Sequence, residues 1–343
     1  MEYFVFILLL SPLLFLKNRY LYWFSVSIAT IFLSLRGSED EYSRLLIHSY
    51  TLGELLNQSA LLIFSEKGQI LPLVNGFILE FDLPAQVIFL IYVPLQLVIF
   101  AYVTYRMVGL YNVAFFLAMC QSVLFTSMSG LRMGLTASLT LLIIYYFERK
   151  SKGRAFGGCL VSMANHYTAY TTPLLLFFWT PRVWFVIAVF VLAIIVKLSG
   201  ILEYVFSLFQ SGSLVSNYLR AENYTYELRG LDYLKSAQQV IVCCFVALNY
   251  KRILFPSVSN RLLFGSYVLS TALLIAFSGF AIFAYRLAAV FSLAEPLIIA
   301  KILSAYANRW PVLHGATFFV GLTIAYVNYV ILSRLQPYDF LVG

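Results

Sequence analysis

Apolar residues follow one another in long runs along most of the chain, and short polar or charged segments separate these runs. Several runs, such as 85–105 and 312–332, reach the roughly 20 residues that an α-helix needs to cross the hydrocarbon core of a bilayer. Each is expected to be helical, because unpaired backbone groups in hydrocarbon cost several kcal/mol. The pattern predicts an all-α, polytopic membrane protein with spans near residues 3–16, 19–35, 85–105, 109–128, 131–147, 154–168, 169–181, 183–199, 233–250, 261–279, 281–301 and 311–332.

Two consecutive apolar segments in the middle of the chain, 154–168 and 169–181, are shorter than a normal bilayer crossing. Pro173 lies inside the second segment and Pro181 ends it. Proline removes a backbone hydrogen bond from a helix, and such breaks are tolerated in a membrane where protein or water covers the freed groups. We therefore expect broken or re-entrant helices in this region.

Two longer segments, about 36–84 and 200–232, remain between the predicted spans. Leucines spaced among polar residues in the first segment predict amphipathic helices that lie on the membrane interface. The second segment carries aromatic side chains beside Arg220 and Arg229, a composition typical either of an aromatic belt or of a platform that binds sugars. We expect a single transmembrane domain, residues 1–343, with about 11–12 spans and two large loops.

The composition excludes a soluble globular protein. Hydrophobic residues make up 62% of the chain and charged residues 11%, against about 45–50% and 25% in soluble domains. The net charge of +8 does not predict nucleic-acid binding, because no basic patch alternates with aromatic residues. All four cysteines lie in apolar runs without the spacing of a zinc site, so we expect them to be small core residues.

Lysine and arginine are distributed unevenly between the two ends of the predicted spans, and in membrane proteins they concentrate in short cytoplasmic loops. One assignment of sides places 13 basic residues and one acidic residue, Glu148, on the cytoplasmic side. The other ten basic residues then lie outside with 13 acidic residues, and so do both long loops. Glu295 remains within a span, where we expect a structural pairing with Lys301.

Charged groups within or against membrane spans are costly, so they are candidates for function. Arg36 ends the second predicted span, and Arg132 stands at the outer end of the fifth. His166 closes the sixth span on the same side, and Arg286 lies six residues into the eleventh. Four segments thus bring cationic or titratable groups to one membrane level. An interfacial arginine can also simply snorkel, and a histidine can simply pack, so both interpretations stay open.

Several arginines at the outer membrane interface suit a phosphate-bearing lipid. The planar guanidinium binds phosphate oxygens in pairs and stays charged at any physiological pH. If a diphosphate leaves during sugar transfer, these arginines would stabilise the developing negative charge. The acidic cluster of Glu39, Asp40 and Glu41, or alternatively His166, would take a proton from the incoming hydroxyl. Spacing alone does not choose among these bases.

Five short elements of the sequence resemble motifs of EpsG-like, Wzy-type polysaccharide polymerases, in the same order along the chain. They are the segments 36–42 (Arg-Gly-Ser-Glu-Asp-Glu-Tyr), 65–68, 129–137, 165–169 and 284–287. The pattern departs from the family where Glu41 separates Asp40 from Tyr42, and where Met133 occupies a position that is often polar. The first departure weakens the assignment of Asp40 as a base.

The resemblance implies a GT-C-like, metal-independent glycosyltransferase without a cofactor at the periplasmic face of the bacterial inner membrane. It would transfer a growing O-antigen or exopolysaccharide chain from undecaprenyl diphosphate onto the next lipid-linked repeat unit. The expected partners are that lipid-linked oligosaccharide, membrane lipid and a chain-length regulator. The catalytic candidates are Glu39, Asp40, Arg132, His166 and Arg286. The candidates for binding diphosphate or sugar are Arg36, Tyr42, Glu66, Arg132, Arg220, Arg229, Tyr285 and Arg286.

Two other classes of membrane protein remain as alternatives. A flippase for the same lipid-linked sugar would show inverted repeats and charges along a path through the membrane midplane. An O-antigen ligase would carry a histidine near a late external loop, and the loop 200–232 contains none. A sugar O-acyltransferase would need a histidine-centred site near a cytoplasmic donor, whereas His166 is expected outside.

Overall fold

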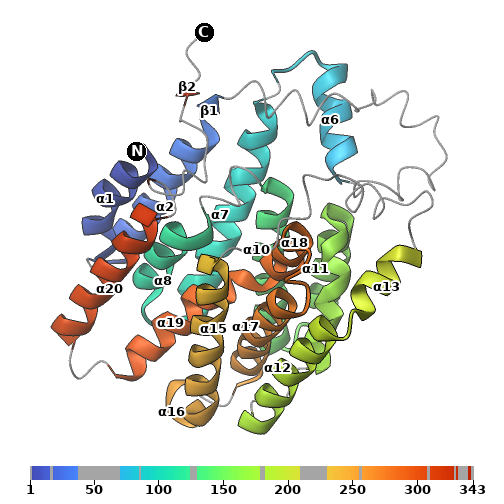
Figure 1. The fold of residues 1–343 in the computed structure, drawn as a ribbon. Helices are drawn as coiled ribbons and strands as arrows, with labels where there is room; N and C mark the ends of the chain where they lie inside the picture. Colours follow the sequence, from blue (N-terminus) through green and yellow to red (C-terminus); the bar gives the residue numbers. More distant parts are fainter. Residues whose placement is uncertain are drawn as a thin grey trace. The chain divides into compact units, whose positions relative to one another are not determined.

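The computed structural model describes residues 2–15, 18–37, 70–84, 86–123, 130–177, 182–208, 230–254, 257–306, 310–327, 330 and 339–340. These residues are almost entirely helical, which confirms the all-α prediction (Figure 1). Within them, the only strands are β1 (Arg36–Gly37) and β2 (Asp339–Phe340), which pair antiparallel. The chain forms two compact units, Met1–Ala169 with Ile299–Gly343, and Tyr170–Ile298.

The helices of the first unit pack around the neighbouring helices α7 and α10, directly or through one another. They are α1 (Glu2–Phe15), α2 (Arg19–Ser34), α6 (Ile70–Glu80), α7 (Val87–Met107), α8 (Tyr111–Ala118), the π-helix η1 (Met119–Val123), α10 (Leu131–Glu148), α11 (Lys152–Asn165) and α20 (Trp310–Tyr326). α7 packs against α2, α8 and α10, and α10 packs in turn against α11. Most residues of α10 and about half of those of α7 are buried, so this layer forms the core of the unit.

A glycine allows α7 and α10 to approach each other closely. A Cβ atom at Gly134 of α10 would overlap the side chain of Gln96 in α7. Farther along the same two helices, the rings of Tyr102 and Tyr145 lie 5.8 Å apart. α7 and α10 therefore run in the same direction, and a small residue at their contact brings the backbones together, as is common between membrane helices.

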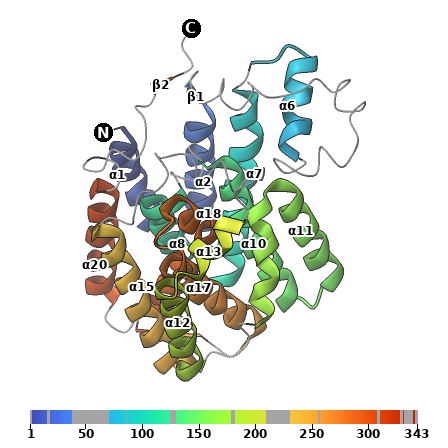
Figure 2. The same cartoon turned by 45° about the vertical axis from the view of Figure 1, so that its right-hand side comes forward.

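The second unit is built around α17. Its helices are α12 (Val183–Leu198), α13 (Ile201–Leu208), α15 (Gly230–Leu248), α16 (Tyr250–Ile253), α17 (Val258–Ala276) and α18 (Ala281–Ser292). α17 packs against α12, α15 and α18 (Figure 2). It is buried along nearly its whole length, including serine and threonine side chains, because neighbouring helices cover it on several sides.

Two helices among the described residues, α7 and α17, are long and apolar enough to cross a membrane, with mean hydropathies of 2.3 and 1.3. A third candidate is the pair Phe283–Ser292 and Ala294–Ala305, bent by 45° between α18 and α19 (Ala294–Ala305). These three lie where spans 85–105, 261–279 and 281–301 are predicted. Shorter apolar helices occupy other predicted spans. The chain is thus a helical membrane protein, and the number of 11–12 spans stays a prediction.

Two segments differ in detail from the predicted pattern. The expected broken region contains a 3-10 helix, η2 (Tyr167–Phe177), with Pro173 inside it. A 3-10 helix is tighter than an α-helix and usually short, so its presence here fits a chain that proline interrupts. The helix α6 lies within the segment 36–84, where no span is predicted. Its apolar run is too short to cross a bilayer, which is why the sequence pattern does not predict a span there.

Candidate active site

The structure describes five of the candidate site residues. Arg132, His166, Tyr285 and Arg286 are described with their side chains, and Arg36 through its backbone in β1. The other candidates lie outside the described residues: Glu39, Asp40, Tyr42, Glu66, Arg220 and Arg229. The predictions made for these six therefore stay predictions.

Arg132 is the second residue of α10, and its position is tied to the end of α11. The Nδ2 amide of Asn165, the last residue of α11, donates to the backbone carbonyl of Arg132 at 2.7 Å. The same amide donates to Oγ1 of Thr136 at 2.9 Å. Asn165 is completely buried, and breaking such bonds would leave an amide without partners at considerable cost. The start of α10 and the end of α11 are therefore held together.

His166 follows Asn165 directly, where α11 ends in an extended backbone conformation. Its buried ring lies 4.4 Å from that of Tyr167, and its Nδ1 atom is 2.7 Å from the Thr168 hydroxyl. The backbone N–H of Thr168 also donates to Nδ1, at 3.2 Å. Because a backbone N–H can only donate, Nδ1 must accept, and the proton of the neutral ring sits on Nε2. This geometry suits His166 to donate a hydrogen bond from Nε2 rather than to act as a general base.

Tyr92 of α7 is a further candidate, which the sequence pattern does not single out. Its hydroxyl is buried and has no hydrogen-bond partner among the described residues, and Arg132 is close enough to act on it electrostatically. Oδ1 of Asn165 likewise has no partner there. The sequence feature that could have identified Tyr92 is its position within a predicted span, where a buried hydroxyl needs a hydrogen-bond partner. Polar atoms with unused bonding capacity thus surround the start of α10.

The opposite end of the first unit carries a belt of basic and aromatic side chains. Guanidinium groups lie over tyrosine rings, at 5.5–5.8 Å from the ring centroids, in the pairs Arg106–Tyr102, Arg149–Tyr145 and Arg154–Tyr146. Lys301 donates from Nζ to the carbonyl oxygen of Met107 at 2.8 Å. Lysine, arginine and tyrosine gather in this way where a membrane helix meets the interface. We call this set of residues the basic belt.

The basic belt and the Arg132 region are separated by the length of a bilayer core. α10 has 18 residues, which at 1.5 Å per residue span roughly 27 Å, close to the ~30 Å hydrocarbon thickness. Arg132 lies at the first end of this helix and Arg149 directly follows the other. α11 runs back from the basic belt, so His166 lies at the same end as Arg132.

Arg36 also lies at the Arg132 end of the first unit. The hydroxyl of Tyr22, near the start of α2, donates to the carbonyl oxygen of Ala101, near the end of α7, at 2.9 Å. The start of α2 therefore lies against the end of α7, and because the two helices also pack along each other, they are antiparallel (Figures 1 and 2). Both views show β1 at the Arg132 end of the unit (Figures 1 and 2). Three predicted residues thus share one end of the unit.

Arg286 and Tyr285 belong to the second unit. Both are half-buried side chains near the middle of α18. Tyr285 packs with Phe277 against a buried apolar cluster of Leu274, Ala284 and Ala288. Arg286 is therefore carried by a helix that is firmly packed on one side. The predicted meeting of Arg286 with Arg132 involves both units and stays a prediction.

Glu295 has a different partner from the one that the charge pattern predicts. Its Oε2 atom accepts a hydrogen bond from Nε2 of Gln239 at 2.9 Å. Thr271 donates to Oε1 of Gln239 at 3.5 Å, and Lys301 donates to a backbone carbonyl in the basic belt. The side-chain amide of Gln239, on a neighbouring helix, binds the buried carboxylate of Glu295. This agrees with the expected structural role of Glu295 but not with Lys301 as its partner.

A sequence model of the EpsG family matches residues 70–340. The chain belongs to the EpsG family. This match includes Arg132, His166 and Arg286, and it begins after the motif at residues 36–42. Neither a curated protein nor a solved structure matches the chain. Membership in the EpsG family confirms the resemblance and makes the chain a membrane protein of the polysaccharide-polymerase, glycosyltransferase-like kind.

Metal ligands do not gather in the part of the chain that the structure describes. No three histidine, cysteine, aspartate or glutamate side chains lie there in an arrangement that could hold a metal ion. At the end of the first unit opposite the basic belt, the described groups that could bind a phosphate are the Arg132 guanidinium and the His166 ring. Metal-independent chemistry stays a prediction for this member of the EpsG family.

Proposed function

We propose that this protein polymerises lipid-linked oligosaccharide repeat units at the outer face of the bacterial cytoplasmic membrane. It transfers a growing O-antigen or exopolysaccharide chain from undecaprenyl diphosphate onto the next lipid-linked unit. The observation that carries the proposal is that Arg132 and His166 lie at the same end of the first unit, opposite the basic belt, where Asn165 ties the end of α11 to the start of α10. Membership of the EpsG family supports the reaction class.

The basic belt supports the proposed orientation of the first unit. Arginine and lysine concentrate on the cytoplasmic side of membrane helices, and tyrosine gathers at the interface. If the belt containing Arg106, Arg149 and Arg154 faces the cytoplasm, Arg132 and His166 face the outside. A lipid diphosphate sits at this level, with its tail in the bilayer and its sugars in water.

In the proposed reaction, a hydroxyl of the incoming repeat unit attacks the anomeric carbon of the growing chain. The bond from this carbon to the diphosphate oxygen breaks, and the diphosphate leaves with the electron pair. Arg132 binds the leaving phosphate oxygens, and the Nε2–H of His166 donates to the same group or to a sugar oxygen. The hydroxyl proton goes to a carboxylate, for which Asp40 and Glu39 are the candidates.

The remaining candidates complete this proposal as binding groups. Arg286, with Tyr285 beside it, and Arg36 are assigned to the second phosphate and the neighbouring sugar. The repeat unit is assigned to residues of the two long segments, Tyr42, Glu66, Arg220 and Arg229. A GT-C-like arrangement of 11–12 spans and a chain-length regulator as membrane partner belong to the same proposal.

The test replaces Arg132 by alanine and, separately, by lysine in a strain that lacks the native gene. We expect polymer to fall about 100-fold or more, as when a group that binds a leaving anion is removed. Lysine should fail too, because a point charge does not reproduce the paired guanidinium bonds. Gel banding of the glycan measures chain length, and mass spectrometry of the lipid carrier should show single repeat units.

The matched control is Arg149→Ala, which removes the same charge from the other end of α10. Its polymer should keep normal length and amount, provided that membrane insertion, checked by immunoblot, is unchanged. Long polymer at normal levels in Arg132→Ala would overturn the proposed function.

A lipid-linked sugar transporter is the second candidate, and the bend of 45° between α18 and α19 favours it. Broken helices of this kind form substrate sites in many transporters. Purified protein in liposomes separates the two activities, because a transporter changes the side on which the lipid-linked sugar lies, whereas a polymerase changes product length.

A further inference from the structure

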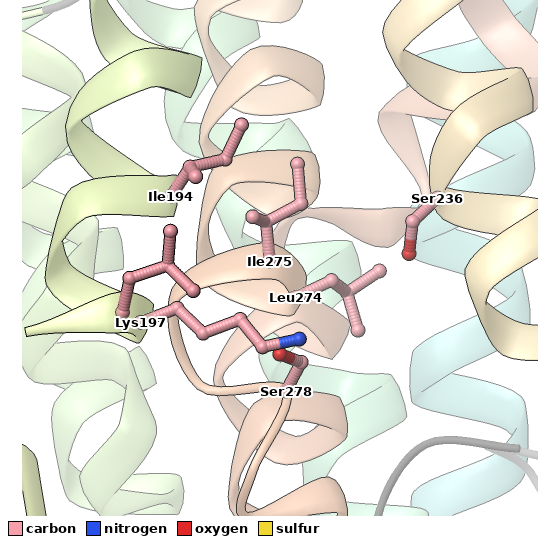
Figure 3. A pocket seen from close by; sticks show the side chains of 7 residues that line it. Ile194, Lys197, Ser236, Leu274, Ile275 and Ser278 are labelled. Carbon is pink, nitrogen blue, oxygen red and sulfur yellow. The ribbon is translucent and has the colours of Figure 1, made fainter. Parts of the chain in front are cut away.

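The cavity between α12, α15 and α17 of the second unit suits apolar groups rather than a charged ligand (Figure 3). Its volume is about 220 Å³, and its walls include Ile194, Leu274 and Ile275. Lys197 and Ser278 also contribute to the walls, but the accessible lining as a whole is almost entirely apolar. A ligand with a charged head is better matched by a surface that exposes several cations, and the basic belt of the first unit contains such a surface.

This surface is the segment 148–154, which joins α10 to α11 and which we call the α10–α11 turn. It contains four basic residues and one acidic residue, Glu148. The side chains of Lys150, Lys152 and Arg154 are exposed, and none of the three pairs with a carboxylate in the part of the chain that the structure describes. Glu148 lies close enough to Lys301 to interact with it electrostatically. The α10–α11 turn therefore presents three cations to its surroundings.

Lys150 occupies a backbone position that usually belongs to glycine. The backbone N–H groups of Lys150 and Ser151 donate to the carbonyl oxygens of Phe147 and Tyr146, at 3.1 Å each, so α10 ends in a Schellman motif. The φ angle of Lys150 is 54°, in the left-handed region that a side chain disfavours. Glycine would end α10 with less strain, so what lysine adds at this position is its charge.

Lys152 and Arg154 stand in the first turn of α11, which is the positive end of the helix dipole. A cation at this end lowers the stability of a helix. The preference of cytoplasmic loops for basic residues would be met by other positions in the turn as well. Neither helix stability nor membrane topology therefore accounts for the placement of these charges, whereas an anionic partner would offset their cost.

The guanidinium of Arg154 is oriented by an aromatic ring. It lies over the ring of Tyr146 on α10, at 5.8 Å from the centroid, and this stacking leaves the N–H groups at its edge for a phosphate. Arg149 lies instead over Tyr145, whose ring contacts Tyr102 of α7. Because consecutive residues of a helix point about 100° apart, the two arginines lie on different sides of α10.

An exposed apolar face of α11 continues from these cations. Lys152, Phe156 and Leu160 follow one another at intervals of four residues, so they share one face of the helix, and the two apolar side chains are 66% and 53% exposed. Val161 is exposed beside them, and a Cβ atom at Gly157 would meet nothing within 4 Å. This face begins about 6 Å along the helix from Lys152, a distance that suits a lipid phosphate and its first acyl carbons.

We propose that the α10–α11 turn and this face of α11 bind an anionic phospholipid. Arg154, Lys150 and Lys152 hold its phosphate, whose oxygens accept from guanidinium and ammonium groups, and an acyl chain lies along Phe156 and Leu160. The apolar face fits a lipid tail better than an acidic segment of protein. The site lies at the end of α10 opposite Arg132. It depends neither on the proposed polymerase activity nor on the side of the membrane that the basic belt faces.

Native mass spectrometry of the purified full-length protein in neutral detergent measures the binding. Phosphatidylglycerol and phosphatidylcholine with the same acyl chains are titrated in separate arms. Glycerol 3-phosphate supplies a head group without tails, and a polyglutamate peptide represents an acidic protein segment. We expect phosphatidylglycerol to bind most tightly. Arg154→Gln should weaken it about tenfold, the effect of losing one charge-assisted hydrogen bond.

The matched control is Arg149→Gln, which removes the same charge from the same turn but on the side that faces α7. This variant should keep the wild-type affinity for phosphatidylglycerol. An equal loss in Arg149→Gln and Arg154→Gln would mean that only the overall charge matters, and it would overturn the proposed site.

A second variant, Lys150→Gly, separates the charge from the backbone. Glycine relieves the left-handed strain, so the unfolding temperature of the lipid-free protein should rise while phosphatidylglycerol binds more weakly. Wild-type affinity in both Lys150→Gly and Arg154→Gln would overturn the proposal. So would phosphatidylcholine, glycerol 3-phosphate or the peptide binding as tightly as phosphatidylglycerol. Because no glycan is present, these outcomes do not bear on polymerisation, which the Arg132 variants test separately.

Discussion

Two buried polar regions of this protein look alike in composition and differ in how well their groups are paired. In the second unit, Gln239, Thr271 and Glu295 hydrogen-bond to one another across three helices. In the first unit, Asn165 uses its amide to join α10 to α11, but its Oδ1 atom and the Tyr92 hydroxyl have no partner among the described residues. We call these the Glu295 network and the Arg132 corner.

This difference distinguishes polar groups that stabilise helix packing from polar groups that can bind a ligand. A polar network whose groups pair with one another stabilises helix packing and leaves little for a ligand. A region in which a guanidinium stands beside unpaired acceptors and hydroxyls costs stability and offers those groups to a ligand instead. Tyr267, beside the Glu295 network, also has a hydroxyl without a partner in the described part of the chain, but the nearby charge is a carboxylate that would repel a phosphate. This contrast favours the Arg132 corner, rather than the Glu295 network, as the proposed phosphate site.

The largest effect within this comparison is expected from His166, whose two conservative replacements separate its ring nitrogens. Glutamine places an N–H near the position of Nε2, whereas asparagine reaches only the position of Nδ1. If His166 acts as a donor through Nε2, His166→Asn should lower the polymerisation rate about 100-fold and His166→Gln only about tenfold. The rates are measured on lipid-linked repeat units in proteoliposomes. The reverse order would contradict the donor assignment.

The membrane helices were predictable because bilayer thickness constrains them. The apolar run 85–105 becomes α7, Val87–Met107, and the run 261–279 becomes α17, Val258–Ala276. Hydropathy does not predict the structure of apolar runs that are shorter than a bilayer crossing. An example is η2, a 3-10 helix with a proline inside it.

The Arg132 corner was predictable only in part. Arg132 and His166 stand out in sequence because charge near a membrane span is costly. Tyr92 does not stand out, because a tyrosine is tolerated as an apolar residue and its unpaired hydroxyl is visible only once α7 and α10 are packed. Asn165 belongs to the same class, since its role depends on a carbonyl 33 residues away in sequence.

Glu295 provides the next test, at the level of stability. Glu295→Ala leaves the buried amide of Gln239 without its acceptor, which should lower the free energy of unfolding by about 1–3 kcal/mol. Glu295→Gln preserves an acceptor and should cost less than about 1 kcal/mol. Denaturant unfolding in detergent measures both. Polymerisation should be unchanged in Glu295→Gln, and its loss there would assign the Glu295 network to the reaction.

The smallest effect comes from a pair of matched substitutions, Tyr92→Phe and Tyr267→Phe, which each remove one buried, unpaired hydroxyl. Both should leave stability unchanged or raise it by up to about 1 kcal/mol, because neither hydroxyl has a partner to lose among the described residues. Only Tyr92→Phe should slow polymerisation, roughly two- to tenfold, the value of one hydrogen bond to the ligand. Since the chemical change is the same, a loss of activity in both variants would mean that pairing does not distinguish the two regions. A loss confined to Tyr92→Phe would assign the unpaired groups around Arg132 to the substrate.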